Sequence, residues 1–288
     1  MRSRLAPPEG LAAVVASMLA WAPMRGKAQV ARRNARSGRK PLISRVNFLI
    51  AGVQKAGTST LDGYLRQHPQ IRMAKSKEIH FFDSNDRFRH AEPDYDAYHG
   101  FFPEPRDNVI YGEATPAYVY WAEAVPRIWQ YHPGMKLIVL LRDPAERAWS
   151  NWRMENQRGR DPWTFSMAIR EERDRSMEVL PAQHRVFSYL DRGFYSEQIR
   201  RIFRFFRPGQ VLFLKSEDLF AEPAPSLRKV FQFLEVEETP VTGNLILNQG
   251  CALGEMDGAD RKYLRDIFRW DVEQVKSMLG WDCGDWLA

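Results

Sequence analysis

The stretch FLIAGVQKAGTST, residues 48–60, decides the fold of this chain. Its first six residues are small or apolar and end in Ala-Gly-Val, which is typical of a parallel strand that is buried on both faces. Residues with helical character continue from the end of the stretch through Leu65. The sequence therefore predicts a strand, a tight turn and a helix, in that order.

The turn QKAGTST, residues 54–60, has the composition of a phosphate-binding loop. A strand that turns through small residues into a helix leaves backbone N–H groups free, and these groups bind anions together with the helix dipole. Lys55 adds a positive charge, and Thr58, Ser59 and Thr60 add hydroxyl donors. The loop is not that of a P-loop NTPase, because Lys55 stands two residues before Gly57 instead of directly after a glycine. An ordinary turn that carries a lysine is the alternative interpretation.

Strands and helices alternate along the rest of the chain. Two further apolar runs predict buried strands, at Lys136–Leu141 and at Val211–Leu214. Helical spacing of apolar residues marks three segments, which are residues 199–206 (ended by Pro208 and Gly209), residues 227–234 and residues 264–279. We therefore expect an α/β fold with a central parallel sheet flanked by helices, which binds ligands at the carboxyl ends of its strands.

A second anion site is predicted at the end of the second strand. Arg142 stands at the strand tip, and Asp143, Pro144 and Glu146 begin a helix as N-cap, first-turn proline and capping-box partner. Ser150 lies two turns further along the same helix face. Arg142 and Ser150 can thus converge on one phosphate, and two anion sites at neighbouring strand ends indicate a ligand phosphorylated at two places. A capped helix with a surface Arg–Asp pair is the alternative.

Composition argues against several classes of protein. The 288 residues are 44% apolar and 12% aromatic, which argues against disorder, and two cysteines do not build a disulfide scaffold. Cys251 and Cys283 either form one bridge or are two free thiols. The six His show no HExxH or CxxC-type spacing, so we expect no metal. The longest apolar run, Leu11–Ala22, is shorter than the ~20 residues that a membrane-spanning helix needs.

Positive charge is concentrated in residues 1–45. This segment has ten Lys and Arg and one acid, a net charge of +9, which leaves −3 for the remainder of a chain whose total is +6. The basic balance therefore gives no reason to expect nucleic acid as a partner. The segment fits a targeting peptide, a helix that contacts an anionic membrane surface, or a disordered arm. We expect a single domain over residues 46–288.

Taken together, these residues resemble the PAPS-dependent sulfotransferases, most closely the heparan sulfate branch (glucosaminyl 3-O- and N-sulfotransferases) and its bacterial relatives. The resemblance covers residues 46–236, with its motifs in the order of the family. They are FLIAGVQKAGTSTL (48–61), KEIHFFD (77–83), DYDAYHGFFP (94–103), GEATPAY (112–118), LLRDPAERAWSNW (140–152), RGFYSEQIRRIFRFF (192–206) and LFLKSEDL (212–219).

The resemblance implies a single P-loop-NTPase-like domain that transfers a sulfuryl group from PAPS (3′-phosphoadenosine 5′-phosphosulfate) to a hydroxyl of a carbohydrate or glycosylated acceptor, without a metal. For the donor it implies Lys55, Ala56, Gly57, Thr58 and Ser59 at the 5′-phosphosulfate, Arg142 and Ser150 at the 3′-phosphate, and Tyr195 as a further contact. For catalysis it implies Glu78 as general base beside Lys55 and His80. For the acceptor it implies Lys77, Glu78, His80 and Asp83.

The chemistry requires residues of these types. In-line attack on sulfur needs a base on the acceptor side, and a positioned carboxylate gives ~10²–10⁴-fold. Charge that develops on the leaving phosphate is stabilised by Lys55 and by backbone N–H groups. The alternatives are a solvated Glu78 paired with Lys77 or Lys75, and a His80 that is only structural. Phe81 and Phe82 are expected in the core.

The chain departs from the heparan branch at two places. Ala114 stands where that branch has a Lys in its EKTP segment, and residues 244–258 contain no Lys or Arg. The second difference argues against heparan itself as the acceptor, and so does the slight negative charge of residues 46–288. A hydroxyl of a small molecule or lipid is the alternative acceptor, and a P-loop kinase is the alternative enzyme. We expect a cytoplasmic protein that can contact a membrane through residues 1–45, with the Golgi lumen as the alternative location.

Overall fold

The computed structural model describes residues 42–89, 92–240, 245 and 254–288. The predictions for the basic segment 1–45 therefore lie outside the described residues, apart from residues 42–45. Most of residues 244–258 and Cys251 also lie outside them, so the predicted alternatives for the two cysteines stay open. Cys283 is buried, and its burial raises the pKa of the thiol to about 11.

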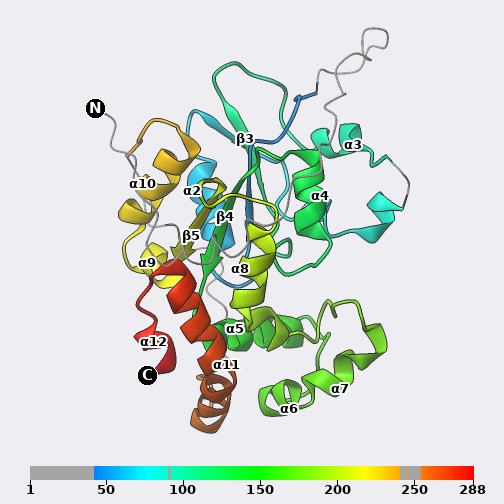
Figure 1. Cartoon of the computed structure of the whole chain (residues 1–288), viewed down its shortest axis with the longest axis vertical. Helices are drawn as coiled ribbons and strands as arrows, with labels where there is room; N and C mark the ends of the chain where they lie inside the picture. Colours follow the sequence, from blue (N-terminus) through cyan, green and yellow to red (C-terminus); the bar gives the residue numbers. More distant parts are fainter. Residues whose placement is uncertain (1–41, 90–91, 241–244, 246–253) are drawn as a thin grey trace.

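A parallel sheet of five strands forms the centre of the molecule (Figure 1). The strands are β1 (Phe48–Gly52), β2 (Ile71–Met73), β3 (Ile110–Ala114), β4 (Lys136–Leu141) and β5 (Val211–Lys215), in the order β2-β3-β1-β4-β5. The three strands predicted from apolar runs are confirmed as β1, β4 and β5. Every residue of β1 is buried, because helices cover both faces of the sheet.

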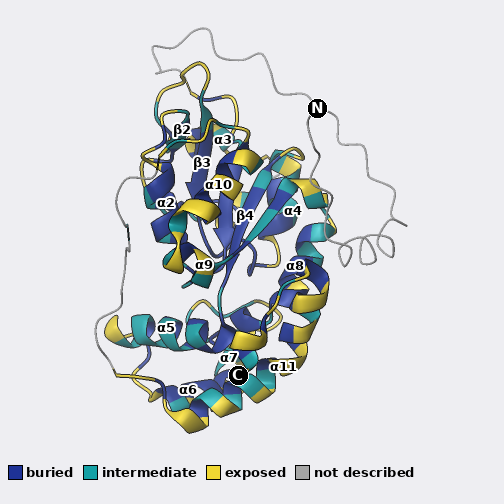
Figure 2. Ribbon diagram, turned by 90° about the vertical axis from the view of Figure 1, so that its left-hand side faces the viewer, coloured by how far each residue is buried: buried dark blue, intermediate teal, exposed yellow. Residues whose placement is uncertain are grey.

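The direction of each crossover decides which face of the sheet a helix covers, because parallel crossovers are right-handed. One face carries α2 (Thr58–Leu65), α9 (Ser216–Ala221) and α10 (Pro223–Leu234), and the other carries α3 (Tyr95–His99), α4 (Ala124–Tyr131) and α8 (Tyr195–Phe203). Beyond the carboxyl end of β4 lie α5 (Pro144–Gln157), α6 (Phe165–Arg170), α7 (Glu172–Ser176), α11 (Gly258–Leu279) and α12 (Gly284–Leu287). Figure 2 shows α5, α6, α7 and α11 as a lobe below the sheet.

Two predicted helices are confirmed as α10 and α11, and the third is shorter than expected. The helix predicted over residues 199–206 is α8, which ends at Phe203. One further turn follows, in which the Phe206 N–H donates to the Ile202 carbonyl at 2.9 Å, and this turn buries Phe206 in the core. Phe81 and Phe82 are core residues as expected, with 1% and 0% of their surfaces exposed.

The start of α5 confirms one part of the capping prediction and contradicts the other. Asp143 is the N-cap, and its side chain accepts hydrogen bonds from the N–H groups of Ala145 and Glu146 at 2.8 and 3.3 Å. Glu146 as the capping-box partner is wrong. The Asp143 N–H instead donates to Glu217 of α9 at 3.0 Å, while Glu146 pairs with Arg261 of α11 at 2.6 Å. Partners from distant helices have replaced the local one.

Candidate active site

The loop between β1 and α2 has a backbone conformation that few residues adopt. Lys55 has a φ of 74° and Gly57 a φ of 86°, both in the left-handed region. Glycine is also required at position 57 because a Cβ there would lie 2.9 Å from Cζ of Phe220. Gly57 is the N-cap of α2, and no side chain caps the helix at that position. The first turn of α2 can therefore offer its backbone N–H groups to an anion.

Arg142 lies beside this loop because β4 is the sheet neighbour of β1. Its Nη1 donates to the Lys55 carbonyl at 3.2 Å, and its Nη2 lies 3.7 Å from Glu146. The carbonyl of Arg142 accepts a hydrogen bond from the Tyr195 hydroxyl at 2.9 Å. Both ends of Arg142 are therefore held, and its guanidinium faces the loop.

Positive charge accumulates around Lys55. Burial lowers the pKa of Lys55 below its ordinary value of 10.5. Three arginines lower that pKa further, Arg142, Arg158 and Arg153, whereas the negative charge of Glu78 raises it. Arg153 has two buried atoms, Nε and Nη2, without a hydrogen-bond partner. Such donors cost free energy unless something satisfies them, so this cluster is suited to bind an anion.

A cavity of about 360 Å³ opens beside Arg142. Phe220 of α9 and Trp286 of α12 line it, together with Ser216 and Glu217. Three polar atoms of these residues are buried without a hydrogen-bond partner, which are Ser216 Oγ, Glu217 Oε2 and Trp286 Nε1. Aromatic rings with a few unsatisfied polar groups are suited to a flat, polar ligand.

The segment 77–83 lies at the carboxyl end of β3, where the Glu78 N–H donates to the carbonyl of Ala114 at 2.9 Å. Glu78 and His80 have φ values of 60° and 52°. With Lys55 they make up three of the five non-glycine residues that have positive φ in the described part of the chain. This conformation costs roughly 1–2 kcal/mol per residue, and residues that adopt it cluster at functional sites.

Glu78 and His80 form a connected group of charges. Lys77 Nζ lies 2.8 Å from Oε1 of Glu78, and His80 Nε2 lies 3.6 Å from Oε2. His80 Nδ1 lies 2.8 Å from Oδ2 of Asp83. His80 and then Lys77 lower the pKa of Glu78 to about 2, whereas Asp83 and then Glu78 raise the pKa of His80 to about 9. Near neutral pH, Glu78 is therefore a carboxylate and His80 a cation.

The structure brings the two predicted sides of the site together at one edge of the sheet. Lys55 and Arg142 follow β1 and β4, and Glu78 and His80 are attached to the end of β3 on the other side of β1. The influence of Glu78 on the pKa of Lys55 agrees with two sides that face the same space. The predicted pairing of Glu78 with Lys77 is present in this arrangement.

Other predicted residues lie around or behind these groups. Ala56 is buried, and Thr58 and Ser59 begin α2. Ser150 is half-buried on α5, one helical turn before Arg153. Asp83 and Tyr195 have no exposed surface; Asp83 is bonded to His80, and Tyr195 is bonded to Arg142 and packs on Trp286. As ligand contacts these residues remain predictions, and the geometry gives Asp83 and Tyr195 a positioning role.

Several candidate site residues were not predicted from the sequence. Arg153 follows Ser150 by three positions on one helix face, so helical spacing could have found it. Arg185, which binds Asp83, and Trp286 stand in segments without a recognisable motif. Only the folded chain shows that they belong to the site.

Comparison with known proteins defines the class to which this fold and site belong. Residues 45–249 match the family model described as sulfotransferase domain, and the chain therefore belongs to the sulfotransferase family. A solved sulfotransferase from Alicyclobacillus acidocaldarius superimposes with a TM-score of 0.75 at 27% identity, over 85% of this chain and 100% of that one. This agreement confirms the predicted fold class.

Among curated proteins, the mouse heparan sulfate glucosamine 3-O-sulfotransferase 3A1 is 32% identical over 201 residues, which cover 70% of this chain and 48% of that protein. The membrane-associated sulfotransferase kil1 of Dictyostelium discoideum is 34% identical over 139 residues, 46% of this chain and 29% of that protein. The chain spans about half the length, or less, of these curated relatives.

The expected cytoplasmic location is wrong, because the relatives include a sulfotransferase that is named as membrane-associated and enzymes that are named for heparan sulfate. Among the residues that the structure describes, no helix combines the length and the apolar character needed to cross a membrane.

Proposed function

We propose that this protein transfers a sulfuryl group from PAPS to a hydroxyl of a carbohydrate or glycosylated acceptor, with Glu78 as the general base. One observation carries the proposal. A cationic loop around Lys55 and Arg142 and an ionised Glu78–His80 pair lie at the ends of neighbouring strands of one sheet. Membership of the sulfotransferase family supports the proposed reaction, and the relatives that are named for glucosamine support a carbohydrate acceptor.

The residues at the site fit PAPS. The loop Lys55–Ser59 would hold the 5′-phosphosulfate through backbone N–H groups and the lysine cation. Arg142 and Ser150 would hold the 3′-phosphate, and Tyr195 would keep Arg142 in place through its carbonyl. The cavity lined by Phe220 and Trp286 would take the adenine ring.

PAPS supplies an activated sulfuryl group whose bond to phosphate breaks during transfer. The chain then has two tasks, to take a proton from the acceptor hydroxyl and to stabilise negative charge on the departing phosphate. Glu78 would perform the first, and Lys55 the second, with the donors of Arg153 close by.

The contacts that keep Glu78 ionised also make it a weak base, because they lower its pKa to about 2. Lys77 and His80 approach different oxygens of the carboxylate. We propose that the entering hydroxyl displaces the Lys77 ammonium from Oε1, while His80 stays at Oε2. Losing Lys77 raises the basicity of Glu78 at the moment when a proton must be accepted.

The test is a transfer assay with the full chain, labelled PAPS and a panel of glycans, phenols and sterols, read by label transfer and by mass. A glycan should gain one sulfuryl group. Glu78→Gln should lower kcat by roughly 10²–10⁴-fold and leave the affinity for adenosine 3′,5′-bisphosphate (PAP) nearly unchanged. Glu273→Gln, an exposed change on α11, is the matched control. Normal turnover by Glu78→Gln would refute the assignment of the base.

A further inference from the structure

The carboxylate of Asp83 is completely buried and interacts with two cationic side chains, those of His80 and Arg185. Its side chain has no exposed surface. His80 Nδ1 lies 2.8 Å from Oδ2 of Asp83, and Arg185 Nη1 donates to the same oxygen at 3.2 Å. Arg185 Nη2 also donates to the backbone carbonyl of Asp83 at 2.9 Å. The other carboxylate oxygen, Oδ1, is buried without a partner, so Oδ2 carries both side-chain interactions.

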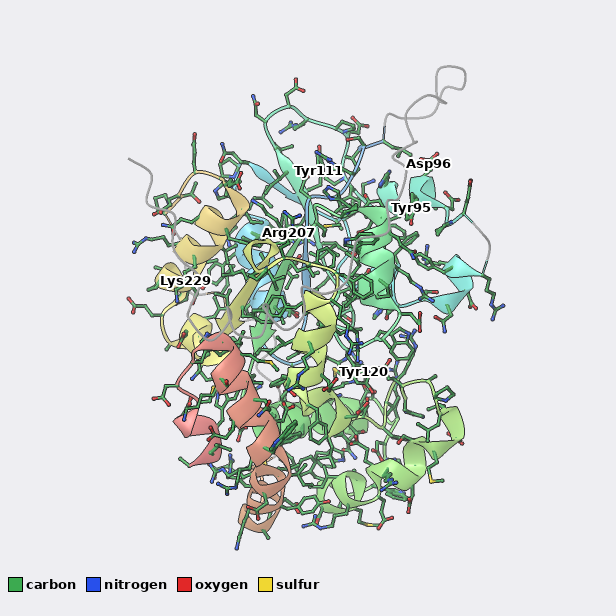
Figure 3. All side chains as sticks on the ribbon, in the orientation of Figure 1. Tyr95, Asp96, Tyr111, Tyr120, Arg207 and Lys229 are labelled. Carbon is green, nitrogen blue, oxygen red and sulfur yellow. The ribbon has the colours of Figure 1, made fainter. Side chains whose placement is uncertain are left out.

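Arg185 belongs to the segment between α7 and α8, and its surroundings hold it in place. Its Cζ lies 4.5 Å from the centroid of the Trp121 ring, and its carbonyl accepts a hydrogen bond from Arg192 at 3.2 Å. Two residues earlier, the Gln183 side chain donates to the carbonyl of Tyr120. Tyr120 lies beside α8, above the lobe of α6 and α7 (Figure 3). The side chain of Arg185 is 54% exposed, but contacts hold both its guanidinium and its backbone carbonyl.

The position of the His80 ring depends on this carboxylate. His80 has a left-handed backbone, and 42% of its side chain is exposed, so packing alone holds the ring weakly. The bond to Asp83 directs the opposite ring nitrogen toward Glu78. A buried carboxylate needs a compensating charge, and an arginine supplies one that does not titrate. His80 loses its proton at high pH, and Arg185 then remains to hold Asp83.

We propose that Arg185 is a positioning residue of the sulfuryl-transfer site, which acts through Asp83 and His80 on Glu78. The proposal rests on the proposed function, because it assigns Arg185 to the same reaction. It makes the segment between α7 and α8 a part of the acceptor side. None of the groups that would contact PAPS is involved.

Kinetics of three variants of the full chain test this role. Arg185→Met removes the guanidinium and keeps a chain long enough to pack on Trp121, and it should lower kcat on the order of 10²-fold, because a misplaced catalytic group costs about that much. Arg185→Lys keeps the charge but not the paired donors, so it should lose less. Arg185→Ala should regain part of its kcat when guanidinium ions are added. The acceptor KM and the affinity for PAP should stay near those of the wild type.

Arg127 offers a matched control. It donates to the carbonyl of Phe82 at 3.0 Å and to Asn85 at 2.8 Å, and so it holds the same segment; its charge acts on Asp83 from a distance, without the hydrogen bond that Arg185 makes to that carboxylate. Arg127→Met should keep kcat near that of the wild type. Equal losses in Arg127→Met and Arg185→Met would mean that packing of the segment is responsible, and they would overturn the proposal.

Two kinetic results for Arg185→Met would also overturn the proposal that Arg185 is a positioning residue. The first is unchanged turnover, and the second is a raised acceptor KM at unchanged kcat. The second result would make Arg185 a direct acceptor contact. If the wild type transfers no sulfuryl group to any acceptor, it is the proposed function that fails. NMR of the ligand-free protein then still tests the placement of His80, whose ring signals should change in Arg185→Met and not in Arg127→Met.

Discussion

Replacing Asp83 by Asn should move the alkaline limit of sulfuryl transfer to lower pH. The hydrogen bond to Asp83 is the largest cause that raises the pKa of His80 from 6.5 to about 9. At pH 7.5 a group with a pKa of about 9 is roughly 97% protonated, whereas one with the ordinary value is roughly 9% protonated. If turnover needs the charged imidazole beside Glu78, the variant should lose about tenfold of its rate at that pH.

The assay is the initial rate at saturating PAPS over the pH range from about 5.5 to 10. For the wild type, kcat should be constant on the acid side and fall with an apparent pKa near 9. For Asp83→Asn the fall should begin closer to 6.5, and acidification should restore the rate, because the amide oxygen of asparagine can still accept the hydrogen bond from the protonated His80 ring. Lys55 also has a lowered pKa, so PAP affinity is measured by calorimetry at each pH to separate donor binding from turnover.

Two results would refute this reasoning. A rate that rises as the pH passes 9 would show that neutral His80 acts as the base. If the alkaline limit is the same in the wild type and in Asp83→Asn, the loss of a proton from His80 does not cause it, and another group does. Because His80 and Glu78 interact, each measured pKa belongs to the pair, and the comparison between variants carries the conclusion.

Three further predictions concern binding and stability. Arg142→Ala should weaken PAP by about 2 kcal/mol, roughly 30-fold, and Ser150→Ala by about 1 kcal/mol; unchanged calorimetric affinity in both variants would show that the second anion site is misplaced. Gly57→Ala should lower both Tm and PAP affinity, because its φ of 86° and the 2.9 Å approach of Phe220 leave no room for a Cβ; wild-type values for both would contradict this account of the loop. Glu113 is buried, and its burial raises the pKa to about 7 from 4.5, so the native state should lose about 3 kcal/mol as the pH rises from below 4.5 through 7. Denaturant unfolding of Glu113→Gln should show a weaker dependence on pH over this interval, and an unchanged slope would disprove the shift.

Local patterns in the sequence were sufficient to predict three of the five strands, β1, β4 and β5, and the loop at the donor side. The run KLIVLL favours a buried strand, because its five consecutive apolar residues leave no polar face to turn toward water. β2 and β3 were not predicted, because β2 has only three residues, IRM, with an arginine in the middle, and β3, IYGEA, has a glycine and a glutamate within its five residues. The capping partner of Asp143 was assigned to the wrong residue because Glu217, which takes that role, is 74 positions away.

The sequence by itself determined the fold class, the cationic loop and the order of the motifs. The loop depends on a few neighbouring residues, and the fold class follows from the alternation of such local patterns along the chain. Tertiary structure alone decided what surrounds those motifs. It placed Trp286 beside Arg142, Arg153 near Lys55 and Arg185 on Asp83, and it brought Asp83 within hydrogen-bond distance of His80, which raises the pKa of that imidazole. Charge and burial act through space over a few ångströms, and only the folded chain brings such distant positions that close together.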